Sequence, residues 1–221
     1  IIVIGSASAG RSTRNTFTFE ERKEMIAKFL HEEKLIKPLN TAFIYMRDSA
    51  YNFHDWLIQV KHEVFIQADK QLLISQDDST ALMGYYKDDS SYYLNYFPEW
   101  PLEKAITTNS NLHATDIRNS YFEDVDFEKM LSMVPKSIAT YLSTWKTKKE
   151  YTTLVEEYAF IKKYKEAWKA APYPPTFVTV DAVVIKLNAL LVIKRGRNPG
   201  KGLYALPGGF LDQHEQIEDG C

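Results

Sequence analysis

The sequence predicts an α/β fold with a mostly parallel sheet, followed by a separate β-rich segment. Short apolar runs alternate with amphipathic helical stretches through roughly the first half of the chain, as in folds built from strand–helix–strand units. The pattern from residue 125 to 170 is helical, and three prolines within residues 171–175 then end it. Runs rich in β-branched residues follow the prolines. We therefore expect two domains, with the boundary at the prolines.

The N-terminal segment predicts a strand, a loop and a helix. Residues 1–5, IIVIG, form an apolar run that ends in glycine, as buried parallel strands often do. After a loop rich in Ser and Thr, Thr18 is followed three residues later by Glu21, which is the capping-box signature of a helix start. The apolar face of this helix is predicted to consist of Met25, Ile26, Phe29 and Leu30.

Further strands and helices alternate up to about residue 100. Residues 41–46 and 80–86 are predicted strands, and a short helix is expected at 90–97. Between the two strands lies a predicted helix, whose apolar face consists of Phe53, Trp56, Leu57, Val60 and Val64.

The second half of the chain predicts a long helix and then a hairpin. Residues 151–165 carry an apolar stripe at helical spacing, with Lys and Glu expected on the solvent side. The β-rich runs at 176–186 and 189–196 are separated by Leu187 and Asn188, which predicts an antiparallel hairpin.

The composition excludes several classes of protein. A formal net charge of −2 gives no bulk electrostatic reason to expect nucleic acid or an anionic membrane as a partner. No apolar run approaches the roughly 18 residues of a membrane span, and the N-terminal run is too short for a signal peptide. A single cysteine excludes an internal disulfide framework and is typical of a reducing compartment. We therefore predict a cytoplasmic protein that binds neither nucleic acid nor membrane.

Polar residues gather where the predicted parallel strands end. In open α/β sheets ligands bind at this edge, and backbone amides and hydroxyls there suit phosphate or ribose. Lys87 and Asp88 follow the predicted strand at 80–86 and are expected at the same edge. The loop and helix start after the first strand supply Gly5, Ser6, Asn15 and Arg22.

Thr115 and Arg118 lie three residues apart at a predicted helix start, on one face. A guanidinium offers a fork of permanently charged donors, so this pair suits a phosphate. From spacing alone, a surface ion pair is an equal alternative for Arg118. Trp56 fits a core position better than a stacking platform. Asp48, just past a strand, fits a helix cap as well as a ligand role.

The segment LPGGFLDQHE at 206–215 suggests metal and phosphate chemistry. The glycine pair lets the backbone approach a ligand closely, and Glu215 follows Gly209 by six positions, where the next loop and helix would hold it nearby. A carbonyl oxygen and carboxylates are suitable ligands for Mg²⁺. An ordinary turn with a solvated Glu215 is the alternative for these residues alone.

With its flanking residues VIKRGRNPGKGLYALPG, this segment resembles the Nudix hydrolase family of ADP-ribose pyrophosphatase type. The resemblance implies that Arg195, Arg197 and Gly208 meet the diphosphate of ADP-ribose, and that Gly209 and Glu215 belong to the metal site. The family's box continues after the Glu with Arg-Glu and a Glu-Glu pair. We expect those carboxylates beyond Cys221 in a longer parent protein, and no hydrolysis by the 221-residue chain itself.

The patches before the prolines resemble, in order, the nicotinamide-nucleotide adenylyltransferase family. The segments that carry the resemblance are GSA…NTFTFEER, the stretch around Asp48, Tyr51 and Trp56, GYYKDDSSYYLNYFPEW, and ATDIR. The nearest resemblance is to the bifunctional bacterial form that is fused to a Nudix domain. It implies a doubly wound, Rossmann-like nucleotidyltransferase domain at 1–170, a linker at 171–176 and the first part of an α+β Nudix domain at 177–221.

The resemblance implies transfer of AMP from ATP to nicotinamide mononucleotide, giving NAD and pyrophosphate with Mg²⁺. Arg118 and Thr115 would hold the ATP phosphates. The other residues given a nucleotide-binding role are Gly5, Ser6, Asn15, Arg22, Asp48, Trp56, Lys87 and Asp88.

The sequence also departs from the adenylyltransferase pattern. His113 stands where the family usually has Ser, and Thr16 where Pro is common. The family's first strand and its His-x-Gly-His loop are expected before Ile1, so the domain would lack its first strand here and the chain would make no NAD. The rival hypothesis is a regulator whose Nudix-like domain binds ADP-ribose or NAD without hydrolysis. Assembly into a homo-oligomer stays open.

Overall fold

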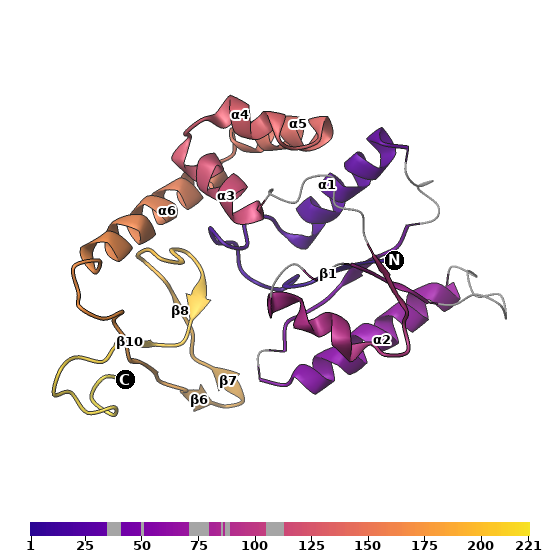
Figure 1. Ribbon diagram of the computed structural model, residues 1–221. Coiled ribbons are helices and arrows are strands. Elements are labelled where there is room, and N and C mark those ends of the chain that lie inside the picture. The colour runs from indigo at the N-terminus through magenta and orange to yellow at the C-terminus, as the bar shows by residue number, and fades with distance from the viewer. Residues whose placement is uncertain (35–40, 50, 71–79, 85, 87–88, 105–112) are drawn as a thin grey trace. The chain divides into compact units, whose positions relative to one another are not determined.

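The computed structural model (Figure 1) describes residues 1–34, 41–49, 51–70, 80–84, 86, 89–104 and 113–221. The chain divides into two compact units, each described by itself below. The first unit comprises residues 1–9 and 17–144, and the second comprises residues 10–16 and 145–221. The short loop at 10–16 therefore packs with the C-terminal part of the chain.

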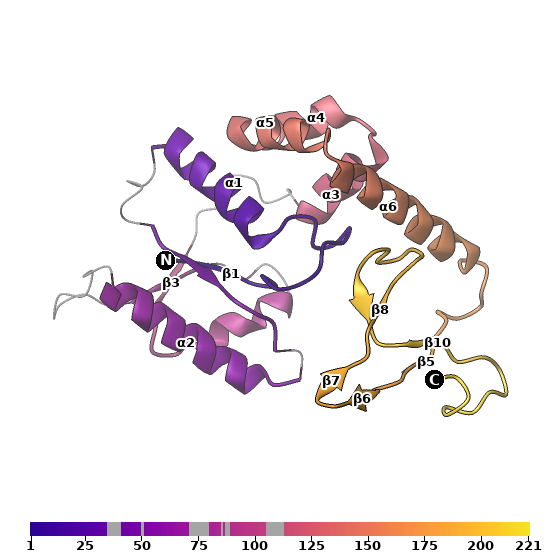
Figure 2. The same ribbon diagram turned by 180° about the vertical axis from the view of Figure 1, so that it is seen from behind.

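The first unit is built on two pairs of parallel strands. β1 (Ile2–Ile4) pairs with β2 (Phe43–Tyr45), and β3 (Leu82–Gly84) pairs with β4 (Leu102–Lys104). Parallel pairing needs crossover connections, and the helices α1 (Phe19–Glu32) and α2 (Phe53–Lys70) occupy the predicted positions. Figures 1 and 2 show these two helices on opposite sides of β1. β4 was not predicted, because its sequence LEK has no apolar alternation.

The predicted capping box begins α1. The Thr18 hydroxyl accepts a hydrogen bond from the Glu21 amide at 3.3 Å, and the Glu21 carboxylate accepts one from the Thr18 amide at 2.9 Å. These reciprocal bonds satisfy two amides that a helix start leaves without intrahelical acceptors.

The core of the first unit lies where α2 packs against the strands. Val60 and Val64 of α2 are buried with Ile44, Met46 and Phe97. The partly buried side chains packed against this cluster are Trp56, Leu57, Leu82 and Trp100. The predicted apolar face of α2 is therefore the core face. The predicted short helix after β3 is a 3₁₀ helix, η2 (Asp89–Tyr96).

Three helices complete the first unit and lead into the second. They are α3 (Ala114–Glu123), α4 (Phe127–Ser132) and α5 (Lys136–Trp145). Tyr121 is buried in α3 and donates its hydroxyl to the Leu142 carbonyl oxygen at 2.9 Å, so the aromatic side chain keeps its polar end paired.

The second unit begins with the loop at 10–16 and the long helix α6 (Lys149–Ala167), which ends before the prolines as predicted. The Arg11 guanidinium lies 5.3 Å from the ring centroid of buried Trp145 and donates to the Thr16 carbonyl oxygen at 2.6 Å. On α6 itself, Glu157 is buried with Leu154, although the pattern placed the glutamates on the solvent side.

Three antiparallel strand pairs follow α6. The predicted hairpin forms between β6 (Ile185–Lys186) and β7 (Ala189–Leu190), with both turn residues at positive φ. β5 (Thr179–Asp181) pairs with β10 (Gly208–Phe210), and β8 (Ile193–Lys194) pairs with β9 (Tyr204–Ala205).

The last segment differs from the prediction. The glycine pair lies within β10, paired with β5, and not in the ordinary turn that was the alternative for these residues. Turns rather than a helix follow at residues 211–221. Among the helices that the structure describes, none combines the length and the apolar character required to cross a membrane.

Candidate nucleotide sites in the two units

In the first unit, the end of β1 is held by two charged side chains. The Asp48 carboxylate accepts a hydrogen bond from the Ser6 amide at 3.1 Å. The Arg22 guanidinium donates to the Gly5 carbonyl oxygen at 2.7 Å and to the Ser6 carbonyl oxygen at 3.3 Å. Ser6 has a φ of 49°, a conformation that costs energy for a side chain with a β-carbon. The four residues form one contact network at the carboxyl end of the strand.

Burial has a larger effect on the pKa of the Arg22 guanidinium than the charge of the nearby Asp48 carboxylate has. Loss of solvent lowers the pKa of Arg22 from its usual value, and the nearby Asp48 carboxylate partly opposes that shift. The Nε atom of Arg22 is buried without a hydrogen-bond partner among the described residues. Arg22 thus fixes the backbone at Gly5 and Ser6 and offers no exposed Nε to a ligand.

Thr115 and Arg118 meet at the start of α3. An Arg118 terminal nitrogen donates to the Thr115 hydroxyl oxygen at 3.1 Å. Arg118 is half-buried, and Thr115 is exposed. No ion pair of Arg118 is present among the residues that the structure describes. The alternative role of Arg118 in a surface ion pair therefore has no support from those residues. The pair presents a cation and a hydroxyl at one helix start.

The remaining predicted residues of the nucleotide pocket do not all join these two groups. Trp56 packs into the core, stacked with Phe53 at 5.6 Å between ring centroids. Asn15 belongs to the second unit, where its backbone amide donates a hydrogen bond to the Ser12 hydroxyl oxygen at 3.0 Å. Lys87 and Asp88 lie outside the described residues.

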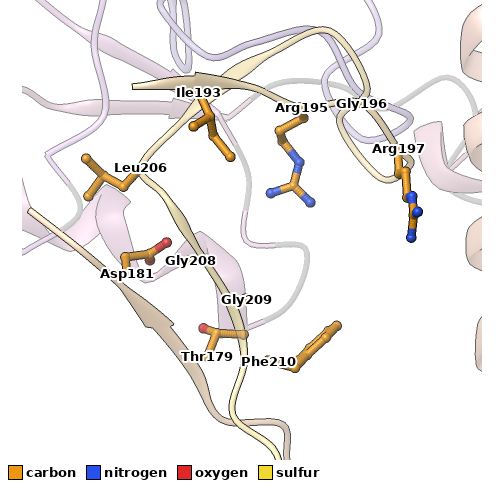
Figure 3. Close-up of a pocket in the computed structure, with 10 residues that line it drawn as sticks. All are labelled: Thr179, Asp181, Ile193, Arg195, Gly196, Arg197, Leu206, Gly208, Gly209 and Phe210. Carbon is orange, nitrogen blue, oxygen red and sulfur yellow. The ribbon is translucent and has the colours of Figure 1, made fainter. Parts of the chain in front are cut away.

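The second unit contains a pocket of about 730 Å³ between its strands and the loop after β8 (Figure 3). The two guanidinium groups, from Arg195 and Arg197, lie along one side of it. Asp181 of β5 and Phe210 of β10 lie on the other side. The complete lining is Thr179, Asp181, Ile193, Arg195, Gly196, Arg197, Leu206, Gly208, Gly209 and Phe210.

One hydrogen bond orients the Arg195 side chain. Its Nε donates to the Pro199 carbonyl oxygen at 3.0 Å, and Figure 3 shows the terminal nitrogens pointing into the pocket. These nitrogens have no hydrogen-bond partner among the described residues. Two convergent cations beside an exposed aromatic ring can bind a diphosphate and stack a planar group. The sequence predicted both arginines but missed Asp181 and Phe210, which lie on strands without a recognisable motif.

Gly208 allows β10 to lie close to β5. A β-carbon at Gly208 would lie 2.1 Å from the Val180 carbonyl oxygen and 2.8 Å from the Asp181 Cα. No heavy atom would lie within 4 Å of a β-carbon at Gly209. Gly208 therefore lets β10 approach β5 closely, whereas the approach to a ligand that the sequence predicted for the glycine pair stays a prediction.

The predicted metal ligands do not by themselves fit a divalent cation. The Glu215 carboxylate accepts a hydrogen bond from the Asp212 amide at 2.9 Å, within a turn. Among the described residues, no group of three or more His, Cys, Asp or Glu side chains could hold a metal ion. Gly209 contributes only a carbonyl oxygen, and Mg²⁺ needs several oxygen ligands.

The comparison with curated proteins decides the family. Over 159 residues the chain is 33% identical to the nicotinamide/nicotinic acid mononucleotide adenylyltransferase of Acinetobacter baylyi, which covers 72% of this chain and 77% of that protein. The chain belongs to this adenylyltransferase family. No family model matches the sequence. The family is one of enzymes, as the resemblance implied.

Two solved structures extend the likeness to nearly the whole chain. A bifunctional NMN adenylyltransferase/ADP-ribose pyrophosphatase from Francisella tularensis, crystallised with AMP and a Mn ion, matches with a TM-score of 0.83 and 30% identity. A second crystal structure of the same protein matches with a TM-score of 0.84 and 30% identity. Each match covers 99% of this chain but only 62% of the other chain.

The ADP-ribose pyrophosphatase of Methanocaldococcus jannaschii is 38% identical to this chain over 71 residues, 32% of this chain and 38% of that protein. These likenesses confirm the predicted resemblance and the fold class, a Rossmann-like nucleotidyltransferase domain followed by a Nudix segment. They do not favour the rival hypothesis of a non-hydrolysing regulator.

Proposed function

We propose that this chain is part of a bifunctional enzyme of NAD metabolism. The adenylyltransferase part would transfer AMP from ATP to nicotinamide mononucleotide, releasing pyrophosphate and forming NAD. The Nudix part would act on ADP-ribose. The observation that carries the proposal is that one chain holds a Thr–Arg pair at a helix start in its first unit and a two-arginine pocket in its second.

Charge and position account for the proposed transfer. The 5′-phosphate of the mononucleotide attacks the α-phosphorus of ATP, and pyrophosphate leaves, so negative charge accumulates on the phosphate oxygens. Arg118 would neutralise part of that charge, with Thr115 holding its guanidinium. The network of Ser6, Arg22 and Asp48 would keep the strand end in a shape that accepts the nucleotide. No covalent enzyme intermediate is required.

We assign residues 1–170 to the adenylyltransferase part, 171–176 to a linker and 177–221 to the Nudix part. We propose Mg²⁺ as the metal that accompanies the nucleotide phosphates, and the cytoplasm as the location. The described residues offer no three-ligand metal group. We expect the pocket lined by Arg195 and Arg197 to bind ADP-ribose.

Isothermal titration calorimetry with ADP-ribose tests the Nudix assignment. Replacing both Arg195 and Arg197 by Ala should weaken binding at least about tenfold, because each arginine supplies a charge-assisted contact. Lys194→Ala is the matched control, since it removes a cation from the end of β8, next to Arg195, and is not part of the pocket lining. Equal affinity of the double variant and wild type would refute the assignment of this pocket.

Titration with ATP tests the adenylyltransferase assignment separately. Arg118→Ala should weaken ATP binding at least about tenfold, since a charge-assisted contact to phosphate is lost. Lys23→Ala removes an exposed cation of α1, whose partner is Glu20 at 3.8 Å, and should leave ATP binding unchanged. If both variants bind ATP equally well, Arg118 is not a phosphate ligand.

A further inference from the structure

Glu157 of α6 is a buried acidic side chain with a partner in the arginine loop, residues 195–203. It is 5% exposed and is the one buried carboxylate among the described residues. Its Oε2 accepts a hydrogen bond from the Gly200 amide at 3.0 Å. Figures 1 and 2 show the loop after β8 beside the long helix α6. A carboxylate is costly to bury, so its place against this loop requires an explanation.

The same peptide group connects Glu157 to Arg195. The Gly200 amide nitrogen and the Pro199 carbonyl oxygen belong to one planar peptide unit. The amide donates to Glu157, and the carbonyl accepts from Arg195 Nε at 3.0 Å. Hydrogen bonds in such a chain polarise one another, and the carboxylate makes the peptide carbonyl a stronger acceptor. The Glu157 acceptor oxygen thus acts on the Arg195 guanidinium through a single peptide.

The rest of the arginine loop is closed by backbone hydrogen bonds. The Gly202 amide donates to the Arg195 carbonyl oxygen at 2.7 Å, and the Arg195 amide donates to the Leu203 carbonyl oxygen at 2.8 Å. Gly200 has a φ of 75°, which favours glycine at this position. These bonds close the base of the loop. None of them holds the Pro199–Gly200 peptide, whose carbonyl oxygen accepts the hydrogen bond from Arg195 Nε.

We propose that Glu157 is a positioning residue for the two-arginine pocket. It holds the Pro199–Gly200 peptide so that Arg195 Nε is fixed and the terminal nitrogens face the diphosphate of ADP-ribose. This role rests on the proposed Nudix function of the pocket. Glu157 touches no substrate and acts only through the peptide and Arg195.

A double-mutant cycle in the 221-residue protein tests the proposal. ADP-ribose binding is measured by calorimetry for wild type, Glu157→Ala, Arg195→Ala and the double variant. Glu157→Ala should weaken binding about tenfold, while Glu157→Gln, which keeps an acceptor oxygen, should stay within about threefold of wild type. In the Arg195→Ala background, Glu157→Ala should have no further effect, because its action passes through Arg195.

Leu154→Ala is the matched control for a general loss of stability. Leu154 is buried on the same helix and makes no hydrogen bond to the arginine loop. It should lower the melting temperature and leave the ADP-ribose affinity of the folded protein unchanged. The proposal is overturned if Leu154→Ala weakens binding as much as Glu157→Ala does, or if the Glu157 and Arg195 effects add.

A second measurement separates this proposal from the proposed function. In protein labelled with ¹⁵N-arginine and ¹⁵N-glycine, solvent exchange of Arg195 Nε–H and of the Gly200 amide is followed by NMR without ligand. Both should exchange faster in Glu157→Ala and at the wild-type rate in Glu157→Gln. If wild type does not bind ADP-ribose, the proposed function fails. Faster exchange then still supports the orienting contact, and unchanged exchange overturns it.

Discussion

At the scale of single residues, Gly208 is the position where the smallest change should have the largest effect. A β-carbon there would lie 2.1 Å from the Val180 carbonyl oxygen, well inside van der Waals contact. Gly208→Ala should therefore separate β10 from β5 and lower the free energy of unfolding by about 1–3 kcal/mol. Urea denaturation followed by circular dichroism measures this change.

Gly209→Ala is the matched control for Gly208→Ala. Its β-carbon would meet no heavy atom within 4 Å, so its stability should differ little from that of wild type. Equal stability of the two variants would show that β10 does not pair with β5 at the distance described.

The ion pair between Lys61 and Glu99 should make stability depend on pH. Lys61 Nζ lies 2.6 Å from a Glu99 carboxylate oxygen, and this contact lowers the pKa of Glu99 below its usual 4.5. Because Glu99 is more acidic when folded, its contribution is present above pH 4.5 and is lost as the pH falls through the lowered pKa. The stability difference between wild type and Glu99→Gln should therefore shrink in acid and in high salt.

Thermal unfolding of both proteins between neutral and acidic pH measures the Glu99 effect. Glu63→Gln changes a carboxylate on α2, the helix of Lys61, that makes no ion pair among the described residues. Its difference from wild type should not follow the same pH course. A Glu99→Gln difference that is constant with pH would contradict the prediction.

Local spacing predicted which residues meet when they lie near one another in the sequence. Thr115 and Arg118, or Thr18 and Glu21, are three residues apart, and helix geometry alone brings them together. The contact of Glu157 with Gly200 spans 43 residues, and no helical or strand period encodes it. The buried carboxylate was therefore placed on the solvent side.

At the scale of elements, the turn between β6 and β7 contains a strained residue. Leu187 has a φ of 47° and is 93% exposed, so its side chain gains little packing in return. Two-residue hairpin turns with both φ values positive favour Asn and Gly. Leu187→Asn should stabilise the hairpin by about 0.5–1 kcal/mol, measured by urea denaturation.

Leu187→Ala separates backbone strain from the loss of an exposed apolar side chain. Alanine also lacks a preference for positive φ, so it should not reproduce the stabilisation. If both variants stabilise the protein equally, the gain comes from removing the exposed Leu187 side chain and not from relieving strain in its backbone.

Elements with clear periodicity were predicted well, and short strands were not. α2 has its apolar face at the predicted residues because an amphipathic helix shows its buried side over many residues. β4, with three residues, is too short to show alternation, and it is defined by its pairing with β3. The strand pairing of the glycine pair was not predicted, because it depends on β5 residues almost thirty positions away.

At the scale of the whole molecule, packing groups residues in a way that sequence order does not reveal. The loop at 10–16 follows β1 along the chain but packs within the second unit. A β-carbon at Gly10 would lie 3.2 Å from a Leu203 methyl group, at the base of the arginine loop. Proline positions indicated where a helix ends. They carried no information about which helix packs with which strands.

If the two units hold the two proposed sites, each nucleotide should protect a different part of the chain from hydrogen exchange. ADP-ribose should slow exchange in residues 193–210, which form one side and the floor of the pocket, and should leave α3 unchanged. ATP should slow exchange at residues 2–9 and at the start of α3, where Ser6 and Arg118 lie. Mass spectrometry of proteolytic peptides resolves these regions.

The exchange experiment also tests the loop at 10–16. Asn15 in this loop was predicted to bind the nucleotide of the adenylyltransferase part, although it packs in the second unit. Protection of this loop by ATP would support the predicted role of Asn15. Protection by ADP-ribose alone would instead assign the loop to the pyrophosphatase site. Arg118→Ala should abolish the ATP pattern and preserve the ADP-ribose pattern. If both nucleotides protect the same peptides, one site binds both, and the assignment of one activity to each unit is wrong.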